Sequence, residues 1–267
     1  MENVKDFYRQ FSDQIISKRF NSPYPLRKAA HFAQYDAVAK HAEEGMQILD
    51  AGCGEGVLSV MMALRGAQVS GIDLSEPNID AAKNYANEAG ISSIDFRTGD
   101  AENLPFPDNS FDLVVSSHVL EHLPDFDKGL REVMRVTKKR AVVAIPTILN
   151  PASMVQVGHG WFYLKGLRSF AGLPIGFAKT LNAILRGDEG VNEGYVGTDA
   201  THIFRFPSVM KKKISDAGYT LVSYEASSIV LPYFNTLLPV TKFLDKWKDK
   251  PVLKNLGYGT TFVIEKD

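Results

Sequence analysis

The sequence predicts an α/β fold built on a doubly wound sheet. Between residues 47 and 146, short apolar runs typical of strands alternate with helix-forming segments, which is the order of a parallel sheet with helices on both faces. The first apolar run is followed at once by an acid and three glycines at alternate positions, Asp50, Gly52, Gly54 and Gly56. The helix-forming run 57–64 comes next, so this stretch predicts a strand, a tight turn and a helix.

The segments around this alternation divide the chain further. Apolar residues recur at helical spacing between Phe7 and Ile16, and a second helix is predicted from about 25 to 41. A helix ending at Gly218 and strands at 219–225 and 259–265 are predicted to return the chain to the sheet. The predicted units are an N-terminal helical cap (1–44), a cofactor-binding core (45–147), an inserted lid that binds the acceptor (148–205), and a C-terminal completion of the core (206–267) with a helical insertion at 229–258.

The glycine turn has the properties of a nucleotide site. Glycine lets the backbone approach a ligand closely, and a helix start offers unpaired N–H groups. Asp73 ends the next apolar segment, where acids bind ribose hydroxyls in nucleotide-binding folds. The dinucleotide fingerprint has its third glycine one residue later than this chain, and it lacks an acid at the position of Asp50. An acid at the turn favours a ligand with a positive charge.

The spacing D-x-G-x-G-x-G over 50–56 resembles motif I of the class I S-adenosylmethionine-dependent methyltransferases. Three later segments, 71–75, 96–105 and 110–116, are similar to motifs II, III and IV of that family, and 119–123 is similar to the segment after the fourth strand in small-molecule members. The resemblance covers about 45–146 and extends more loosely to the C-terminus. It implies a Rossmann-like methyltransferase fold with a seven-stranded sheet whose last strand is antiparallel.

The resemblance also implies the cofactor, S-adenosyl-L-methionine, and the residues that bind it. Asp73 would hold the ribose hydroxyls, Leu74 would pack on the adenine, Asp100 would accept from the adenine amino group, and Ala101 would donate its backbone N–H. The full set of cofactor-binding residues predicted in this way is Asp50, Gly52, Cys53, Gly54, Asp73, Leu74, Asp100, Ala101, Glu102, Ser117 and His118.

Methyl transfer from a sulfonium is an in-line displacement, which requires alignment with the acceptor and exclusion of water. An oxygen or nitrogen acceptor also has to lose a proton, and histidine is the natural base near neutral pH. His118 and His122 follow the fourth predicted strand, where the methyl group should be presented. His202 lies in a segment that resembles the lid return of ubiquinone-type O-methyltransferases. These three histidines are the predicted catalytic residues, and packing or backbone capping is the alternative role for each.

The segment His118–His122 also matches the H-x-x-E-H pattern of one group of zinc hydrolases. That interpretation conflicts with the four methyltransferase motifs around it. Some ubiquinone-type O-methyltransferases place a divalent metal near this segment, and Glu121 and His122 match their ligands. This chain, however, has His118 where that pattern has an acid. The sequence therefore gives no metal ligands that we assign.

The acceptor site is less well defined. The lid is rich in aromatic residues, which suits an apolar or aromatic acceptor, and aromatic residues of the cap could close over the same space. An alternative is that these rings build only the lid's own core. The predicted substrate-binding residues are Tyr8, Tyr24, His159, Trp161 and Tyr163. The apolar face of 229–258 is expected to pack on its own domain, and the alternatives are a lid extension, a dimer contact and contact with a membrane surface.

Composition limits the partners. The formal net charge of −1 over 267 residues provides no basic field for a nucleic acid. A single cysteine, Cys53, excludes an internal disulfide and fits a reducing cytoplasm, where we expect the protein. The N-terminus lacks a secretory pattern, and no apolar run is long enough to span a membrane. The expected partners are a small-molecule acceptor and, at most, a peripheral membrane surface, with the protein a monomer or homodimer.

The sequence therefore predicts a methyltransferase that moves the methyl group of S-adenosylmethionine to a small aromatic or apolar acceptor, on oxygen, with a histidine as candidate general base. Two alternatives remain. One is a membrane-associated methyltransferase of a lipid, quinone or glycan pathway. The other is a cofactor-binding partner protein without catalysis.

Overall fold

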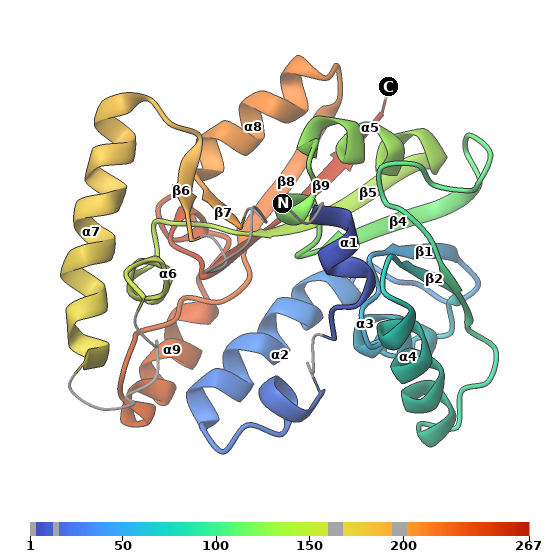
Figure 1. Cartoon of the computed structure of the whole chain (residues 1–267), viewed down its shortest axis with the longest axis horizontal. Helices are drawn as coiled ribbons and strands as arrows, with labels where there is room; N and C mark the ends of the chain where they lie inside the picture. Colours follow the sequence, from blue (N-terminus) through green and yellow to red (C-terminus); the bar gives the residue numbers. More distant parts are fainter. Residues whose placement is uncertain (1–3, 13–15, 160–167, 194–201, 267) are drawn as a thin grey trace.

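The computed structural model describes residues 4–12, 16–159, 168–193 and 202–266. Its centre is a seven-stranded sheet in the order β3-β2-β1-β4-β5-β9-β8 (Figure 1). β9 runs antiparallel to both of its neighbours, and the other observed pairs are parallel. This confirms the predicted α/β class, strand number and antiparallel last strand. The strands of this sheet are β1 (Gln47–Ala51), β2 (Gln68–Asp73), β3 (Asp95–Thr98), β4 (Phe111–Ser117), β5 (Thr137–Pro146), β8 (Thr220–Ala226) and β9 (Gly259–Glu265).

Successive residues of the central strands face two separate cores. Ile48 packs with residues of α2 (Pro25–Ala39) and α3 (Val57–Ala63), whereas Leu49 packs with residues of α5 (Phe126–Val136) and α8 (Pro207–Asp216). The same alternation recurs at Leu113 and Val114 of β4. Because the side-chain period of a strand is two, both faces of this sheet are covered. α4 (Glu76–Glu88) packs over Phe96 and Cys53 in a further cluster.

The N-terminal cap is tied to the core by side chains of α1 (Val4–Arg9). Lys5 pairs with Asp100, and the Tyr8 hydroxyl is hydrogen-bonded to His122. α2 begins with Pro25 at its first position, where a missing N–H has no cost, so the predicted second helix is confirmed. A short π-helical turn, η1 (Ile16–Phe20), lies between them.

The predicted lid region contains two antiparallel pairs of elements. α6 (Pro151–Val157) packs against the 19-residue α7 (Arg168–Arg186), and β6 (Gly190–Asn192) pairs with β7 (Ile203–Arg205). A Cβ atom on Gly176 would lie 1.7 Å from the Met154 carbonyl oxygen, so α6 and α7 meet backbone to backbone. Sequence inspection predicted an insertion here but did not predict a helix as long as α7.

The C-terminal elements lie close to their predicted positions. α8 ends before Gly218, whose φ of +79° continues the chain into β8. The 229–258 insertion contains η3 (Asn235–Leu237), α9 (Leu238–Asp245) and η4 (Leu253–Asn255). The carboxylate of Asp245 accepts from Ser228 and from the backbone of Ile229, which ties the insertion to the sheet. None of the described helices has the length and apolar character needed to cross a membrane.

Candidate active site

A cavity of about 490 Å³ lies where β1, β2 and β4 end. In open α/β sheets, ligands bind at this edge, beside the point where strand order reverses. Here β1 lies between β2 and β4, so the reversal falls at the glycine turn. Ten of the eleven predicted cofactor residues line the cavity: Asp50, Gly52, Cys53, Gly54, Asp73, Leu74, Asp100, Ala101, Ser117 and His118.

The glycine turn needs its glycines for space as well as for conformation. Gly52 has a φ of +88°, and a Cβ atom there would lie 2.2 Å from Cγ2 of Val119. Its backbone N–H donates to the Ile72 carbonyl at 2.8 Å, which holds the turn against β2. A side chain at Gly52 would therefore push the turn away from the segment after β4.

Asp50 is a buried acid of which only one oxygen is hydrogen-bonded to a described residue. Its Oδ2 accepts from the Ser59 hydroxyl at 2.6 Å, and its Oδ1 is buried without a hydrogen bond from any described residue. Burial, with the nearby charge of Asp73, raises the pKa of Asp50 to about 7. A carboxyl group with a pKa of about 7 is only partly ionised at neutral pH. A cation that binds beside it favours the ionised form.

Asp73 organises the turn between β2 and α4. Its Oδ2 accepts the Gly54 N–H at 2.9 Å, and its Oδ1 accepts from the Ser75 N–H at 2.9 Å and from the side chain of Asn78. Burial nevertheless raises the pKa of Asp73 above its ordinary value. The carboxylate lies on the cavity wall, where the resemblance expects a ribose.

Asp100 and Glu102 are both ion-paired with Lys5 of the N-terminal helix. The Lys5 ammonium lies 2.6 Å from Asp100 Oδ2 and 2.5 Å from Glu102 Oε2, so both acids are ion-paired to α1. Glu102 is buried, accepts the Asp125 N–H, and is not part of the cavity wall. Its carboxylate anchors α1 and the start of α5, and its role as a cofactor contact stays a prediction. Asp100 stays on the wall.

A second cluster forms the other end of the cavity. His118 has a φ of +58°, and only a single 3-10 turn, η2 (Leu120–His122), follows it. The two histidines of the H-x-x-E-H pattern therefore do not share a helical face, which contradicts the zinc-hydrolase arrangement. The Glu121 carboxylate is buried between them, 3.4 Å from His118 Nδ1 and 3.9 Å from His122 Nε2.

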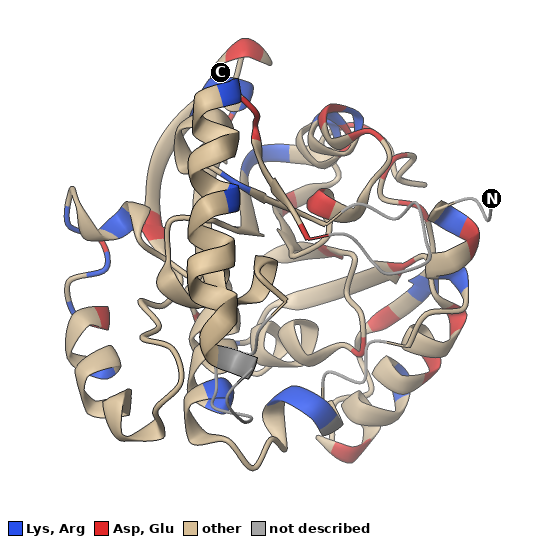
Figure 2. Cartoon of the chain, turned by 60° about the vertical axis from the view of Figure 1, so that its left-hand side comes forward, with Lys and Arg blue, Asp and Glu red and all other residues tan. Residues whose placement is uncertain are grey.

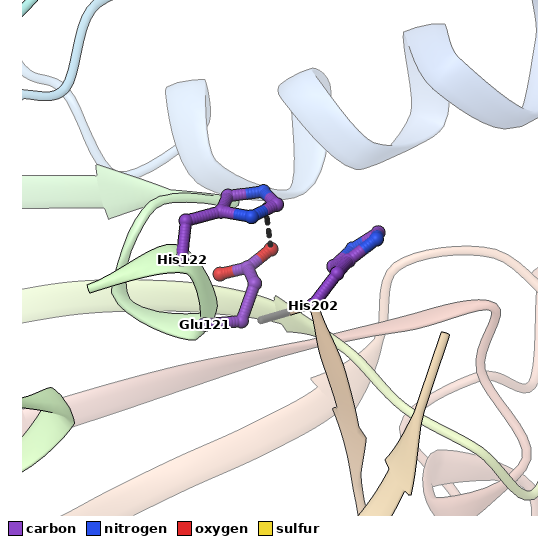
Figure 3. A group of neighbouring side chains, drawn as sticks. All are labelled: Glu121, His122 and His202. Carbon is purple, nitrogen blue, oxygen red and sulfur yellow. Dashed lines mark ion pairs between the residues drawn. The ribbon is translucent and has the colours of Figure 1, made fainter. Parts of the chain in front are cut away.

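The strand β7 brings His202 to the same cluster. Its ring centroid lies 4.6 Å from that of His122, and its Nδ1 lies 2.8 Å from Glu193 Oε2. Figure 3 shows Glu121, His122 and His202 converging from the two segments. One ligand atom from each lies within 4.8 Å of the others, so among the residues that the structure describes this group could hold a metal ion. The three predicted catalytic histidines thus lie together, and the expectation of no metal stays untested.

Glu121 is a completely buried acid on the cavity wall. Both of its oxygens are buried, and neither has a well-aligned hydrogen-bond donor among the described residues. Burial would raise its pKa, yet the adjacent His118, His122 and His202 rings together lower it to about 2. The carboxylate is therefore ionised, and it depends on neighbouring positive charge for its stability.

Several cavity residues escaped sequence inspection. Arg19 and Arg27 bring positive charge to the wall, and Gln156 links Glu193 to the Tyr258 hydroxyl. His31, also on the cavity wall, is buried and hydrogen-bonded to Gln34. Burial and the neighbouring guanidinium groups hold the pKa of His31 well below its ordinary value, so this ring is neutral. Arg27, His31 and Gln34 all belong to α2, and a search for polar residues on one face of that helix could have found them.

The predicted substrate residues have mixed positions. Tyr8 and His159 line the cavity, and Tyr8 contacts His122. Tyr24 packs against the apolar cluster of Leu26 and Ala30 and is not among the residues that line the cavity, so its role in substrate binding stays a prediction. Trp161 and Tyr163 lie outside the described residues.

Comparison with known families identifies the core. Residues 49–145 match the family described as "Methyltransferase domain". The strand order and the four motifs agree with this match. The chain contains a class I methyltransferase domain. The predicted family, enzyme class and cofactor type, S-adenosylmethionine, are thereby confirmed for this domain, which covers the glycine turn, Asp73, Asp100 and Glu121.

Two relatives and one solved structure to which the chain is similar are named as methyltransferases. The chain is 39% identical over 120 residues to a ubiquinone biosynthesis O-methyltransferase of a Chelativorans species, covering 45% of this chain and 47% of the relative. A namesake from Chromobacterium violaceum is 29% identical over 70% of this chain and 75% of its own. The methyltransferase domain of this chain thus spans about half the length of the relatives that it matches first. Magnesium protoporphyrin IX methyltransferase from Synechocystis, solved with bound S-adenosylmethionine, superposes with a TM-score of 0.59 at 16% identity, covering 100% of this chain and 99% of that one, which shows a shared fold.

Proposed function

We propose that this methyltransferase transfers the methyl group of S-adenosylmethionine to an oxygen of a small, aromatic or apolar acceptor. One observation supports this most strongly: a single cavity joins the strand-end acids Asp50 and Asp73 to the Glu121–histidine cluster. The cofactor would bind beside Asp50 and Asp73, and the histidines beside Glu121 would remove the proton from the acceptor. The names of the relatives favour a quinone-type acceptor.

The cofactor would lie along the strand ends. Asp73 would accept from the ribose hydroxyls, with Leu74 and Ala101 at the adenine, and Asp100 would exchange its bond with Lys5 for one with the adenine amino group. Asp50 Oδ1, which has no hydrogen bond from the described residues and lies at the strand ends, would accept from the methionyl ammonium. Arg19 and Arg27 provide the cations for the methionyl carboxylate. This placement directs the sulfonium methyl group toward His118.

Cofactor affinity should rise with pH through neutrality. Asp50, with a pKa of about 7 in the free protein, is mostly protonated below that value, and a cationic ligand binds its ionised form. Lowering the pH then costs up to about tenfold in the dissociation constant per pH unit below the pKa. Titration calorimetry from about pH 5.5 to about pH 7.5 measures this, staying below the pKa of a free α-amino group, about 7.7. Asp50→Asn should bind weakly with a flat profile, and an equally steep profile in that variant would remove Asp50 from this role.

In the transfer step, the acceptor oxygen attacks the methyl carbon while the carbon–sulfur bond breaks, leaving a neutral thioether. The acceptor proton passes to a histidine. Glu193 lies against His202 Nδ1 and therefore favours a proton on that nitrogen, so Nε2 is the basic atom. His118 lines the same space, and Glu121 lies against its Nδ1. Both histidines are thus oriented by a carboxylate as a general base would be.

Replacing the base should lower turnover without changing cofactor affinity. General-base removal typically costs about 10²–10⁴-fold in rate, so we expect a loss in that range for His202→Ala or His118→Ala. His41→Ala, a half-buried histidine outside the cavity wall, is the matched control and should retain full activity. Rates at saturating cofactor, with calorimetric affinities beside them, decide the assignment. If a variant keeps the wild-type rate, the histidine that it replaces is not the base.

A second version of the mechanism is favoured by the unpartnered oxygens of Glu121. Nδ1 of His122 is bonded to the Tyr8 hydroxyl, and Nδ1 of His202 lies against Glu193. Metal-binding histidines commonly have their second nitrogen fixed in this way. Glu121, His122 and His202 therefore fit a divalent cation, which would polarise the acceptor oxygen as a Lewis acid. Glu121 would then provide the negative charge, and His118 would take the proton.

One assay separates these versions from each other and from a non-catalytic partner protein. The whole chain is treated with EDTA, dialysed, and assayed with catechol- and quinol-type acceptors, with and without Mg²⁺, Mn²⁺ or Zn²⁺. Turnover that is indifferent to EDTA supports a histidine base alone, and turnover restored by a cation supports the second version. Tight cofactor binding without methyl transfer to any acceptor of the panel, with or without cations, would contradict the proposed acceptor class.

A further inference from the structure

A row of hydrogen-bonded side chains runs along the lid side of the cavity. The Tyr258 hydroxyl donates to Gln156 Oε1 at 2.6 Å, and Gln156 Nε2 donates to Glu193 Oε2 at 3.1 Å. The same oxygen of Glu193 lies 2.8 Å from His202 Nδ1. All four side chains line the cavity, and we call them the lid network.

The chemistry of these groups determines the direction of each hydrogen bond. A carboxylate only accepts, so Gln156 has to turn its amide nitrogen toward Glu193 and its oxygen toward the Tyr258 hydroxyl. For the same reason, His202 Nδ1 has to carry a proton in order to bond to Glu193. The lid network therefore selects one of the two neutral forms of the His202 ring, the form with its lone pair on Nε2.

The backbone places Glu193 and His202 side by side. Glu193 directly follows β6, and His202 directly precedes β7. The Glu193 N–H donates to the His202 carbonyl at 3.0 Å, and the His202 N–H donates to the side chain of Asn192 at 3.1 Å. A glutamate side chain still has rotational freedom, so a further contact is needed to hold its oxygen at Nδ1, and Gln156 provides that contact.

Gln156 lies on α6, which is tied to the segment before β9. Asn150 Nδ2 donates to the Leu256 carbonyl at 2.8 Å, and the Ser153 hydroxyl donates to the Tyr258 carbonyl at 3.4 Å. The Tyr258 side chain is buried. Its hydroxyl is therefore a fixed donor that sets the orientation of the Gln156 amide.

Cohesion of the lid does not depend on the lid network. Figure 2 shows few charged positions along α7, so apolar packing provides most of this cohesion. A Cβ atom on Gly158 would lie 1.9 Å from the Gly172 carbonyl oxygen, so α6 and α7 pack closely. A separate apolar cluster joins the lid elements and consists of Ile148, Val157, Ala183, Val191, Phe204 and Phe206. The polar side chains on the cavity wall therefore have a reason other than holding the lid together.

We propose that Gln156 is a positioning residue for methyl transfer, which together with Tyr258 holds Glu193 against His202 Nδ1 and so keeps Nε2 unprotonated. The inference rests on the proposed function, to which it adds the residues that orient His202. With the proton held on Nδ1, the lone pair of Nε2 is available to take the acceptor proton or to bind a cation. Gln156 and Tyr258 act on the reaction only through Glu193.

Nitrogen NMR of isotope-labelled histidine rings in the whole chain tests this without an acceptor. EDTA-treated protein is measured at about pH 8.5, well above the ordinary histidine pKa of about 6.5, and the His202 signals are those absent from His202→Ala. We expect the ring proton on Nδ1 in wild type. Gln156→Met removes both amide bonds, so it should move most of the population to the Nε2-protonated form that a histidine side chain favours in water. Tyr258→Phe should cause a smaller shift in the same direction.

The rates should follow the state of the ring. Gln156→Met should lower kcat by about 10- to 100-fold, the scale for removing a partner that orients a functional histidine, with cofactor affinity unchanged. Tyr258→Phe should lower kcat by about two- to tenfold, the scale of one neutral hydrogen bond. The matched control is Tyr224→Phe, because the Tyr224 hydroxyl also donates to an amide oxygen, that of Asn255 at 3.1 Å, but lies outside the cavity wall. This control should change neither the rate nor the ring.

Three results overturn the proposal. The first is a proton on Nε2 of His202 in wild type, and the second is an unchanged ring in a Gln156→Met variant that thermal unfolding shows to be folded. The third is an equal change of the ring in Tyr224→Phe, because the effect would then not be specific to the lid network. If the proton shifts as expected but no acceptor of the panel is methylated, the role of Gln156 is supported and only the proposed acceptor class is contradicted.

Discussion

Asp73→Ala is expected to weaken S-adenosylmethionine binding by about 1–3 kcal/mol, the scale for losing charge-assisted hydrogen bonds. The carboxylate would lose its bonds to the ribose. It would also release the Gly54 N–H and the Ser75 N–H, which it now fixes at 2.9 Å each. The variant therefore removes a ligand contact and loosens the turn that forms the site. Titration calorimetry of the purified protein measures the change.

Asp95→Ala is the matched control for this prediction. Asp95 begins β3, the strand beside β2, and its carboxylate is 46% exposed and paired only with Arg97 among the described residues. It should leave cofactor affinity unchanged. Unchanged affinity in Asp73→Ala itself, with the variant folded, would contradict the ribose assignment.

Glu121→Gln is expected to lower turnover by about a hundredfold or more, because a general base or a bound cation that depends on this charge would lose its support. Cofactor affinity should stay within about twofold, since Asp50 and Asp73 are untouched. The variant should be less stable than wild type at neutral pH, because the neighbouring histidines lower the pKa of Glu121 to about 2 and so favour its ionised form, which glutamine cannot replace. A lower rate with unchanged cofactor affinity, in a variant that thermal unfolding shows to be folded at the assay temperature, distinguishes a chemical role from loss of the fold.

A cation titration of the same variant adds a readout independent of rate. If the cluster holds a metal, calorimetry with Mn²⁺ or Zn²⁺ should show a site in wild type that is absent from Glu121→Gln. Glu132→Gln is the comparison variant, since its carboxylate pairs with Arg135 outside the cavity. Wild-type turnover in Glu121→Gln would contradict both roles given to Glu121, as the support of a histidine base and as a metal ligand.

The sheet could be predicted because its signals are local. Alternating apolar residues such as Ile48 and Leu49 define strands with two buried faces, and the glycine turn and Asp73 mark the strand ends where ligands bind. The order of these segments along the chain then leaves little freedom in topology. For the same reason, ten of the eleven predicted cofactor residues could be placed on one cavity wall.

The features of the site that the sequence did not predict depend on contacts between segments that are far apart in the chain. Glu102 has the same local pattern as a cofactor contact, but Lys5, far away in the sequence, pairs with it. Glu121 and His122 matched a metal-ligand pattern in the sequence, but His202 joins them only because β7 brings it against His122. His31 and Arg27 reach the cavity because α2 packs beside the sheet edge.

Calorimetric titration with S-adenosylmethionine and S-adenosylhomocysteine, with NAD as the control, tests the central claim most directly. We expect micromolar binding of the first two at a single site, with none of NAD, and loss of that binding in Asp73→Ala. Binding of NAD instead, or of none of the three ligands to a folded protein, would contradict the assignment of this cavity to a methyl-donor cofactor.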